Sequence, residues 1–316
     1  YYITTDDYLI LSSEVGVLEI EPERIKVKER LRPGKMLLVD TVKGEVIDDN
    51  ELKDSYANMQ PYGEWLDRNL VELKDLKIPN ERVIEHRGED LSRLQKAFGY
   101  TYESTKDTIL PMARNGAESI AAMGIDSPIP VLSKDQQPLF NYFKQLFAQV
   151  TNPPIDCIRE EVVTSTTTYI GKDGNLLEEN AINCQVLKIH NPILTNTDLM
   201  KIRSMKREGF KVVTLPITYY KNTSLQKALD HLFVEADRAH KDGANILILS
   251  DRGVDENHVA IPSLLAVAGL NQHLVETKKR TSLAVILESG EPREVHHFAT
   301  LLGYGACAIN PYLVQD

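Results

Sequence analysis

The stretch Phe210–Tyr312 decides the fold, because it alternates strand-like and helix-like segments with short connections. Its strand-like segments are Phe210-Lys-Val-Val-Thr-Leu-Pro-Ile, Ala244-Asn-Ile-Leu-Ile-Leu-Ser, Ser282-Leu-Ala-Val-Ile-Leu-Glu and Ala306-Cys-Ala-Ile-Asn-Pro. Helical patterns fill residues 224–242, 262–280 and 291–302 between them. This alternation predicts parallel strands joined by right-handed crossovers. The strands are apolar throughout, as is typical of strands buried on both faces.

The first helical pattern shows how these segments would cover the sheet. Its apolar residues recur at steps of three and four, at Leu225, Ala228, Leu229, Leu232, Phe233, Ala236 and Ala239. Such spacing predicts one apolar stripe facing the strands. Ser224 is suited to cap the amino terminus of this helix, Gly243 to end it, and Pro262 to open the next helix.

Polar residues follow the predicted strands, in Ser250-Asp251-Arg252-Gly253, Glu288-Ser-Gly-Glu and Asn310-Pro-Tyr. Function in parallel α/β folds lies at the carboxyl ends of the strands. Asp251, Arg252 and Glu288 are therefore candidates for a rim or an interface. Arg252 and nearby amides could hold a phosphate. Alternatively, Asp251 and Arg252 pair with each other or face another domain, since no glycine-rich phosphate motif accompanies them.

A second candidate is a group of carboxylates close to two histidines. Glu288, Glu291 and Glu294 lie near His296 and His297, and such a pair could do acid–base or metal chemistry. However, Glu294, His296 and His297 are separated by one and two residues on a predicted helix and would point in different directions. At most one histidine could join Glu288, so a structural role is the alternative. The sequence contains no recognisable nucleophile motif or phosphate loop.

The chain before this stretch has a different character. Residues 1–48 are β-rich and include a hairpin that turns at Lys43-Gly44. Helices are expected at 49–57, 62–70, 89–97, 101–115, 138–150, 155–165 and 196–205, with a kink at Pro111 and an aromatic face on 138–150. Residues 71–87 are charged and aperiodic, which indicates a linker. Residues 116–133 form a long loop of a kind that is often functional.

Composition narrows the class of protein. The 316 residues carry a net charge of −10 without a basic run, which argues against nucleic acid as a partner. No apolar run approaches the ~20 residues that span a membrane. Cys157, Cys184 and Cys307 lack metal spacing and predict free thiols in a reducing compartment. Because the chain starts at Tyr1 inside a strand-like segment, we expect it to be an excerpt of a longer polypeptide.

Five strings resemble the large subunit of glutamate synthase. They are Ser13-Glu-Val-Gly-Val-Leu, Leu31-Arg-Pro-Gly-Lys-Met-Leu-Leu-Val-Asp-Thr, Tyr142-Phe-Lys-Gln-Leu-Phe-Ala-Gln-Val-Thr-Asn-Pro-Pro-Ile-Asp, Gly243-Ala-Asn-Ile-Leu-Ile-Leu-Ser-Asp-Arg-Gly and Glu294-Val-His-His-Phe-Ala-Thr-Leu-Leu-Gly-Tyr-Gly-Ala. The resemblance covers nearly the whole chain. It implies that residues 1–70 are the tail of the glutaminase domain (amidotransferase type 2), that residues 71–87 are a linker, and that residues 88–316 are the central domain.

The resemblance also implies a division of labour. In that family a glutaminase cysteine releases ammonia, which crosses a tunnel to a flavin domain that makes glutamate from 2-oxoglutarate. The nucleophilic cysteine, the FMN site and the iron–sulfur cluster are expected outside this excerpt, which should have no cofactor and no catalytic residue of its own. The implied fold is an incomplete (β/α) barrel-like domain, related to FMN-linked oxidoreductase barrels. The implied partners are the glutaminase and FMN domains, and an electron-donating small subunit or ferredoxin. The implied compartment is the cytoplasm, or the plastid stroma in a plant.

One loop is implied to line the tunnel. Ala122-Met-Gly-Ile-Asp-Ser-Pro resembles a family stretch written Ser-Met-Gly-Asp-Asp-Thr-Pro, which makes Asp126, Ser127 and Pro128 tunnel-lining candidates. Here Ser127 replaces threonine and Ile125 replaces an acidic residue. A small hydroxyl can pass neutral ammonia along without trapping it as ammonium.

Two alternatives to this conduit role stay open from the sequence. One is a stand-alone flavin- or phosphate-binding β/α domain that uses the rim at Asp251, Arg252 and Glu288. The other is a docking module whose acidic surface recruits the electron donor.

Overall fold

The computed structural model describes residues 1–135 and 137–316, and the chain divides into two compact units. The first unit, Tyr1–Trp65, is small and β-rich. Its elements are β1 (Tyr2–Thr4), β2 (Leu9–Ile10), β3 (Ile25–Lys28), β4 (Leu38–Asp40), β5 (Glu45–Ile47) and α1 (Asp49–Ala57). Strands β2, β1 and β3 form an antiparallel sheet, and β4 pairs with β5 as the predicted hairpin. Helix α2 (Tyr62–Asn69) crosses into the second unit.

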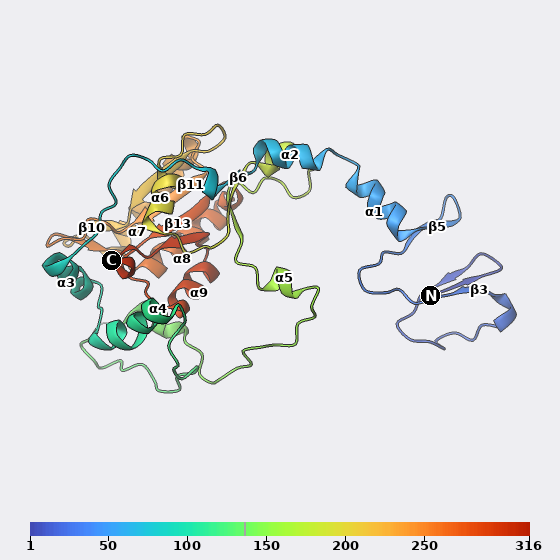
Figure 1. Ribbon diagram of the computed structural model, residues 1–316, viewed down its shortest axis with the longest axis horizontal. Coiled ribbons are helices and arrows are strands. Elements are labelled where there is room, and N and C mark those ends of the chain that lie inside the picture. The colour runs from blue at the N-terminus through green and yellow to red at the C-terminus, as the bar shows by residue number, and fades with distance from the viewer. Residues whose placement is uncertain (136) are drawn as a thin grey trace. The chain divides into compact units, whose positions relative to one another are not determined.

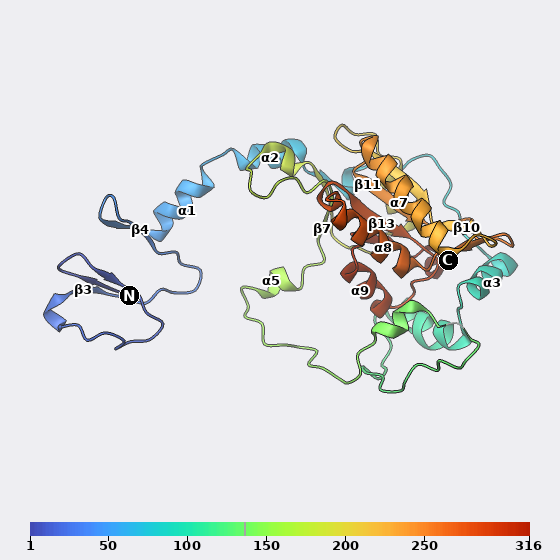
Figure 2. The same cartoon turned by 180° about the vertical axis from the view of Figure 1, so that it is seen from behind.

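The second unit, Leu66–Asp316, is built on a parallel sheet (Figures 1 and 2). Its strands are β9 (Val212–Pro216), β11 (Ile246–Ser250), β13 (Ala284–Glu288) and β14 (Ala308–Asn310), in the order β14-β13-β11-β9. Every neighbouring pair is parallel, as the alternating pattern predicts. A mixed α/β fold with a parallel sheet is therefore confirmed.

Both faces of this sheet are covered, which explains its uninterrupted apolar strands. Leu247 and Leu249 of β11 pack with α7 (Leu225–Lys241), α8 (Ser263–Glu276) and α9 (Val295–Gly303), which lie in front in Figure 2. Ile246 and Ile248 point to the other face, where α6 (Asn196–Arg203) lies in front in Figure 1. That face also carries a second sheet in the order β6-β8-β7, made of β6 (Val71–Glu72), β8 (Val186–Ile189) and β7 (Thr168–Gly171).

Shorter elements complete the second unit. They are α3 (Gly88–Ala97), α4 (Leu110–Asn115), α5 (Glu160–Val163), α10 (Tyr312–Gln315) and an antiparallel ribbon of β10 (Thr218–Tyr220) and β12 (His258–Ala260). The 3₁₀ turns are Pro22–Arg24 in the first unit and Leu73–Asp75, Leu139–Phe143, Ala181–Cys184 and Arg280–Ser282 in the second. A π-helical stretch, Ser104–Ile109, precedes α4. It lies just before Pro111, whose ring clashes with the carbonyl four residues earlier in a regular helix.

Two predicted helices are wrong. Only Leu139–Phe143 of the expected aromatic helix 138–150 is helical, and Leu146, Phe147 and Val150 are exposed. The chain becomes extended at Lys144, because Gln145 accepts a hydrogen bond from the Ile125 amide at 2.9 Å. The expected helix 155–165 is reduced to α5.

Other differences are smaller. Helix α9 starts at Val295 rather than at residue 291, and Thr195 caps α6 through a capping box. Val71, the first residue of the predicted linker 71–87, is buried in the core of the second unit. Ser224 caps α7 as predicted.

Leu247 of β11 is fully buried against the helices that cover the sheet. We therefore expect Leu247→Ala to lower the free energy of unfolding by about 2–5 kcal/mol. Urea denaturation followed by circular dichroism measures this change. The control is Val234→Ala, at an exposed position of the same fold on α7, which should change stability little. Equal effects of the two variants would contradict the assigned core.

Candidate functional site

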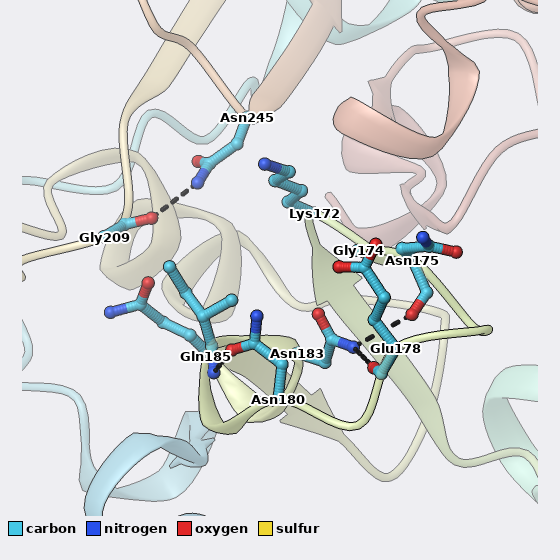
Figure 3. A pocket seen from close by; sticks show the side chains of 10 residues that line it. Lys172, Gly174, Asn175, Glu178, Asn180, Asn183, Gln185, Gly209 and Asn245 are labelled. Atoms are coloured by element: carbon cyan, nitrogen blue, oxygen red, sulfur yellow. Dashed lines mark hydrogen bonds between the residues drawn. The ribbon is translucent and has the colours of Figure 1, made fainter.

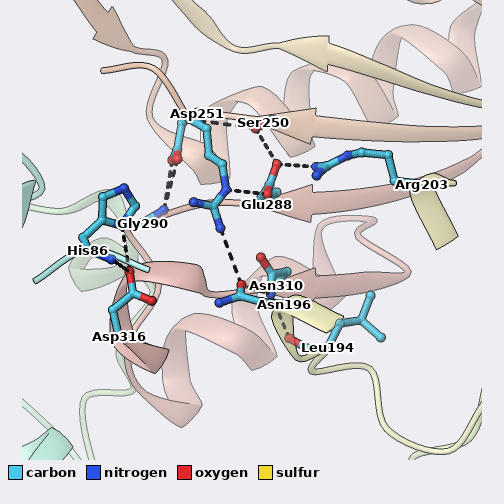
Figure 4. A network of polar contacts seen from close by, with 11 residues as sticks. His86, Leu194, Asn196, Arg203, Ser250, Asp251, Glu288, Gly290, Asn310 and Asp316 are labelled. Atoms are coloured by element: carbon cyan, nitrogen blue, oxygen red, sulfur yellow. Dashed lines mark hydrogen bonds and ion pairs between the residues drawn. The ribbon is translucent and has the colours of Figure 1, made fainter. Parts of the chain in front are cut away.

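The parallel register gathers polar residues at the carboxyl ends of the strands (Figure 4). Ser250 of β11 lies opposite Glu288 of β13, and Glu288 lies opposite Asn310 of β14. All three are buried. Buried polar groups are stable only when they are paired, so each of these side chains needs partners within the domain.

Glu288 is the centre of this cluster. Its carboxylate accepts hydrogen bonds from Arg203 Nη2, Ser250 Oγ and Arg252 Nε, each at 2.6 Å. The Glu288 side chain is 2% exposed, whereas those of Arg203 and Arg252 are 38% and 22% exposed. Two guanidinium groups therefore compensate the charge of one buried carboxylate, and each joins another segment to the strand end.

Arg252 has further contacts beyond Glu288. Its guanidinium lies over the Tyr312 ring at 4.0 Å, and Nη2 is 3.5 Å from Asn196 Oδ1. The Asn310 amide nitrogen also donates to Asn196 Oδ1, at 3.1 Å. Arg252 Nη1 and Asn310 Oδ1 are buried and have no hydrogen-bond partner among the described residues. The contacts of Arg252 link the strand ends to α6 and α10.

Asp251 belongs to a separate, fully buried set of contacts. It accepts hydrogen bonds from Ser289 Oγ and from the Gly290 amide at 3.1 Å, and the Tyr312 hydroxyl is a further partner. Burial raises the pKa of Asp251 to about 7, because the carboxylate loses its hydration and the three donors only partly offset that loss. The alternative in which Asp251 and Arg252 pair with each other is wrong: Arg252 is bound to Glu288 and Asp251 to Ser289, although both contact Tyr312.

The loop after β13 also forms hydrogen bonds with the segment that follows α3. Tyr100 donates to the Gly290 carbonyl at 2.9 Å, and Arg293 donates to the carbonyls of Phe98 and Gly99, both at 3.1 Å. The Arg293 guanidinium lies 4.3 Å from the centre of the Tyr100 ring. A Cβ atom on Gly290 would come within 2.8 Å of the Phe98 ring. Close packing thus requires glycine here, and the strand ends are coupled to the helical segment before the long loop.

The predicted pair of a histidine with Glu288 does not form, but the expectation that Glu294 and His297 point in different directions is wrong, because these two side chains are in contact. Glu291 accepts hydrogen bonds from the backbone amide of Ser263, at 2.8 Å, and from the Ser263 hydroxyl, at the start of α8. His297 Nε2 lies 3.2 Å from Glu294, and His296 Nε2 lies 2.8 Å from the Phe140 carbonyl. Neither histidine pairs with Glu288.

The tunnel-lining candidates lie in another part of the second unit. Asp126, Ser127 and Pro128 are exposed in an irregular segment and take no part in the Glu288 cluster. The neighbouring Gly124 packs so tightly that a Cβ atom there would come within 2.8 Å of the Phe147 backbone. The structure therefore brings Asp251, Arg252 and Glu288 together at the strand ends and leaves the loop candidates apart from them.

Sequence reasoning missed three members of the site. Arg203 and Asn196 come from α6, about 50–90 residues away from their partners in the chain, and Arg293 comes from the loop after β13. In the sequence, only Arg203 stands out, because it lies in the last turn of a predicted helix. A cation there is explained by its attraction to the helix dipole, so the position does not predict Glu288 as its partner.

Most donors of the cluster are already used: both arginines are bound to Glu288, and the Gly290 amide donates to Asp251. Arg252 Nη1 is a buried donor that has no partner among the described residues. The described part of the chain contains no group of three or more His, Cys, Asp or Glu residues that could hold a metal ion. Cys157, Cys184 and Cys307 are free thiols.

Among the helices of the described residues, none is long and apolar enough to cross a membrane.

Fold and site together define an α/β domain whose strand ends are closed by internal ion pairs. Residues 93–316 match the family of the glutamate synthase central domain, and residues 1–65 match the class-II glutamine amidotransferases. The first match covers more than half of the chain, which therefore belongs to the glutamate synthase central domain family.

Named relatives agree with this assignment. The chain is 46% identical over 313 residues to the NADPH glutamate synthase large chain of Bacillus subtilis, with 99% of this chain and 20% of that protein covered. It is 41% identical over 332 residues to the NADH glutamate synthase of Schizosaccharomyces pombe, covering 100% and 16%. It is 39% identical over 323 residues to ferredoxin-dependent glutamate synthase 1, chloroplastic/mitochondrial, of Arabidopsis thaliana, covering 100% and 20%. The chain thus spans about a fifth or less of the length of these relatives.

Glu288→Gln should destabilise the second unit by about 3 kcal/mol, because it leaves two guanidinium groups at the strand ends without a compensating charge. Arg203→Met should lower the free energy of unfolding by less than Glu288→Gln does, since the Arg203 side chain is 38% exposed. Urea denaturation measures both. The control Glu89→Gln removes an exposed contact to Arg93 and should have little effect. A Glu288→Gln variant as stable as that control would contradict the central role of this carboxylate.

The raised pKa of Asp251 should make the stability of the fold depend on pH. Its pKa is raised from its ordinary value to about 7, so between about pH 4 and 7 the folded chain keeps a proton that the unfolded chain has lost. The contribution of Asp251 to the free energy of unfolding therefore falls as pH rises, by about 1.4 kcal/mol per pH unit. Asp251→Asn cannot titrate, so the stability difference between the original chain and the variant should shrink or reverse over this range. A difference that is constant with pH would refute the raised pKa.

Proposed function

We propose that this chain is the central connecting domain of a glutamate synthase together with the tail of its glutaminase domain. The whole enzyme would convert glutamine, 2-oxoglutarate and a reductant into two molecules of glutamate. The observation that carries the proposal is the order of segments in one chain: an amidotransferase match at residues 1–65 precedes a central-domain match at residues 93–316. Domain limits of 1–70, 71–87 and 88–316 fit this order.

The role proposed for the domain is to couple two active sites without completing one itself. The strand-end carboxylates support this role, because their partners are arginines, hydroxyls and amides of the same domain. The same contacts argue against the alternative of a stand-alone flavin- or phosphate-binding domain, since both guanidinium groups of the rim are ion-paired with Glu288. The alternative of a docking module for the electron donor has no contact in the second unit that favours it.

The open parallel sheet is consistent with an incomplete (β/α) barrel-like relative of FMN-linked oxidoreductases. In its favour are four adjacent parallel strands, helices α7–α9 on one face and polar residues at the carboxyl ends. On this proposal FMN and the iron–sulfur cluster are held elsewhere in the enzyme. The partners are the glutaminase and FMN domains, and either an electron-donating small subunit or ferredoxin. The enzyme would work in the cytoplasm, or in the plastid stroma of a plant.

The loop with Asp126, Ser127 and Pro128 is proposed to line the ammonia path. Its exposure supports this, because a wall shared with another domain is exposed when that domain is absent. A serine hydroxyl both donates and accepts hydrogen bonds and does not ionise near neutral pH, so it can contact ammonia without protonating it.

In the whole enzyme, Ser127→Trp should lower glutamine-dependent glutamate formation by about tenfold or more and keep ammonia-dependent formation, because the indole would obstruct the path while the flavin site is untouched. Parallel assays with glutamine and with ammonium salts measure the ratio of glutamine-dependent to ammonia-dependent glutamate formation. Ser133→Trp, in the same exposed loop, is the matched control and should leave both activities intact. Unchanged coupling in Ser127→Trp would reject the tunnel role, and loss of both activities would indicate a folding role instead.

A further inference from the structure

The start of α9 holds the short 3₁₀ turn Leu139–Phe143 in place within the second unit. Phe140, inside this turn, is fully buried, and its ring stacks on the His297 imidazole with the ring centres 4.2 Å apart. The Phe140 carbonyl lies 2.8 Å from His296 Nε2. Because a carbonyl only accepts hydrogen bonds, Nε2 of His296 carries the proton and donates it. Two successive residues of one helix thus contact both the side chain and the backbone of Phe140.

His297 also orients the carboxylate of Glu294. The backbone amide of Arg293 donates to His297 Nδ1 at 3.2 Å, which leaves the proton of the neutral imidazole on Nε2. This Nε2 lies 3.2 Å from Glu294 Oε1 and donates to it. Burial lowers the pKa of His297 and so favours the neutral ring. The neighbours of His297 therefore fix its tautomer, and its donor is directed to Glu294.

The same oxygen of Glu294 contacts the residue that follows the turn. Lys144 Nζ lies 3.4 Å from Glu294 Oε1, and the two side chains are 30% and 23% exposed. The hydrogen bond from His297 and the Lys144 cation lower the pKa of Glu294 to about 2, so the carboxylate is charged at neutral pH. Glu294 therefore joins α9 to the point at which the chain becomes extended.

Beyond this ion pair, the extended segment lies against the loop that carries Ser127. The Gln145 carbonyl accepts a hydrogen bond from the Ile125 amide at 2.9 Å. A Cβ atom on Gly124 would come within 2.8 Å of the Phe147 backbone, so the two backbones touch beside that hydrogen bond. The loop is therefore in contact with this segment two residues before Ser127.

The loop depends on such contacts because it has no buried side chain of its own. Every described residue from 116 to 133 is exposed or only partly buried. A segment without buried apolar side chains opens locally at little cost unless other contacts restrain it. The printed contacts form one continuous series, from α9 through residues 140–145 to the Ile125 amide.

We propose that Lys144, Glu294 and His296 are positioning residues that hold the Ser127 loop where ammonia transfer requires it. This inference rests on the proposed function, in which that loop lines the ammonia path, and adds the residues that keep the wall in place. None of the three would touch ammonia. They act through the backbone of residues 140–145, and a shift of the wall by about 1 Å is enough to impair a positioned reaction step.

Hydrogen–deuterium exchange of the whole enzyme tests whether these contacts hold the loop. We expect peptides covering residues 122–128 to exchange about fivefold faster in Lys144→Met and in His296→Phe, because each variant loses one polar contact to α9. Peptides from β11 and β13 should exchange as in the original enzyme. Lys144→Arg keeps the cation and should keep the slow exchange. Lys227→Met, at an exposed position of α7, is the matched control and should change neither region.

The functional measurement is the ratio of glutamine-dependent to ammonia-dependent glutamate formation in the same variants. This ratio should fall by about threefold or more in Lys144→Met and His296→Phe, because a displaced wall lets ammonia escape before it reacts. Lys144→Arg and Lys227→Met should keep the original ratio. A purely structural role would instead lower both activities together and leave their ratio unchanged.

Faster loop exchange together with a lower ratio supports the inference. It is overturned if loop exchange is unchanged in both Lys144→Met and His296→Phe, if exchange rises equally in β11 and β13, or if the ratio stays constant. Ser127→Trp separates this inference from the proposed function. A ratio that falls in Ser127→Trp alone would keep the conduit role and reject the positioning role, whereas a ratio unchanged in all three variants would reject both.

Discussion

The buried carboxylate of Glu288 is the constraint on which the arrangement of the strand ends depends. A charge that is 2% exposed must be compensated, and the chain does so with guanidinium groups from two directions. Arg203 brings the end of α6, and Arg252 brings the loop after β11 and, through the Tyr312 ring, α10. One side chain on β13 thereby sets the positions of elements that lie far apart in the sequence.

A second buried carboxylate, Asp251, extends this organisation from the strand ends to the helical segment after α3. Asp251 accepts a hydrogen bond from the Gly290 amide, and the Gly290 carbonyl accepts one from the Tyr100 hydroxyl, so the backbone of one residue connects Asp251 to Tyr100. Arg293 adds contacts to the carbonyls of Phe98 and Gly99. Directed hydrogen bonds thus connect the sheet to the segment that follows α3.

The two edges of the sheet differ in how completely their polar groups are used. At the carboxyl edge the carboxylates are bound by arginines, hydroxyls and amides, and both guanidinium groups are ion-paired with Glu288. At the amino edge, where β9 and β11 begin, the carboxamides of Asn183 and Asn245 donate to backbone carbonyls around a cavity (Figure 3). Lys172 and Glu178 line the same cavity and form no ion pair within the part of the chain that the structure describes. Functional sites of α/β folds usually lie at the carboxyl ends of the strands. Polar residues gather there in this domain too, but most of them are bound to one another.

The sequence by itself determined the parallel α/β unit, because its strands are apolar on both faces and its helices carry one apolar stripe each. It also located Asp251, Arg252 and Glu288 at one edge, since parallel strands end together. Their partners depended on the tertiary structure, because Arg203 and Tyr312 reach them only through packing of α6 and α10. Tertiary contacts likewise overrode the helical pattern of residues 138–150, where Gln145 bonds to the Ile125 amide instead of continuing a helix. Local periodicity predicts which faces are buried, but not which distant segment will satisfy a buried charge or compete for a backbone hydrogen bond.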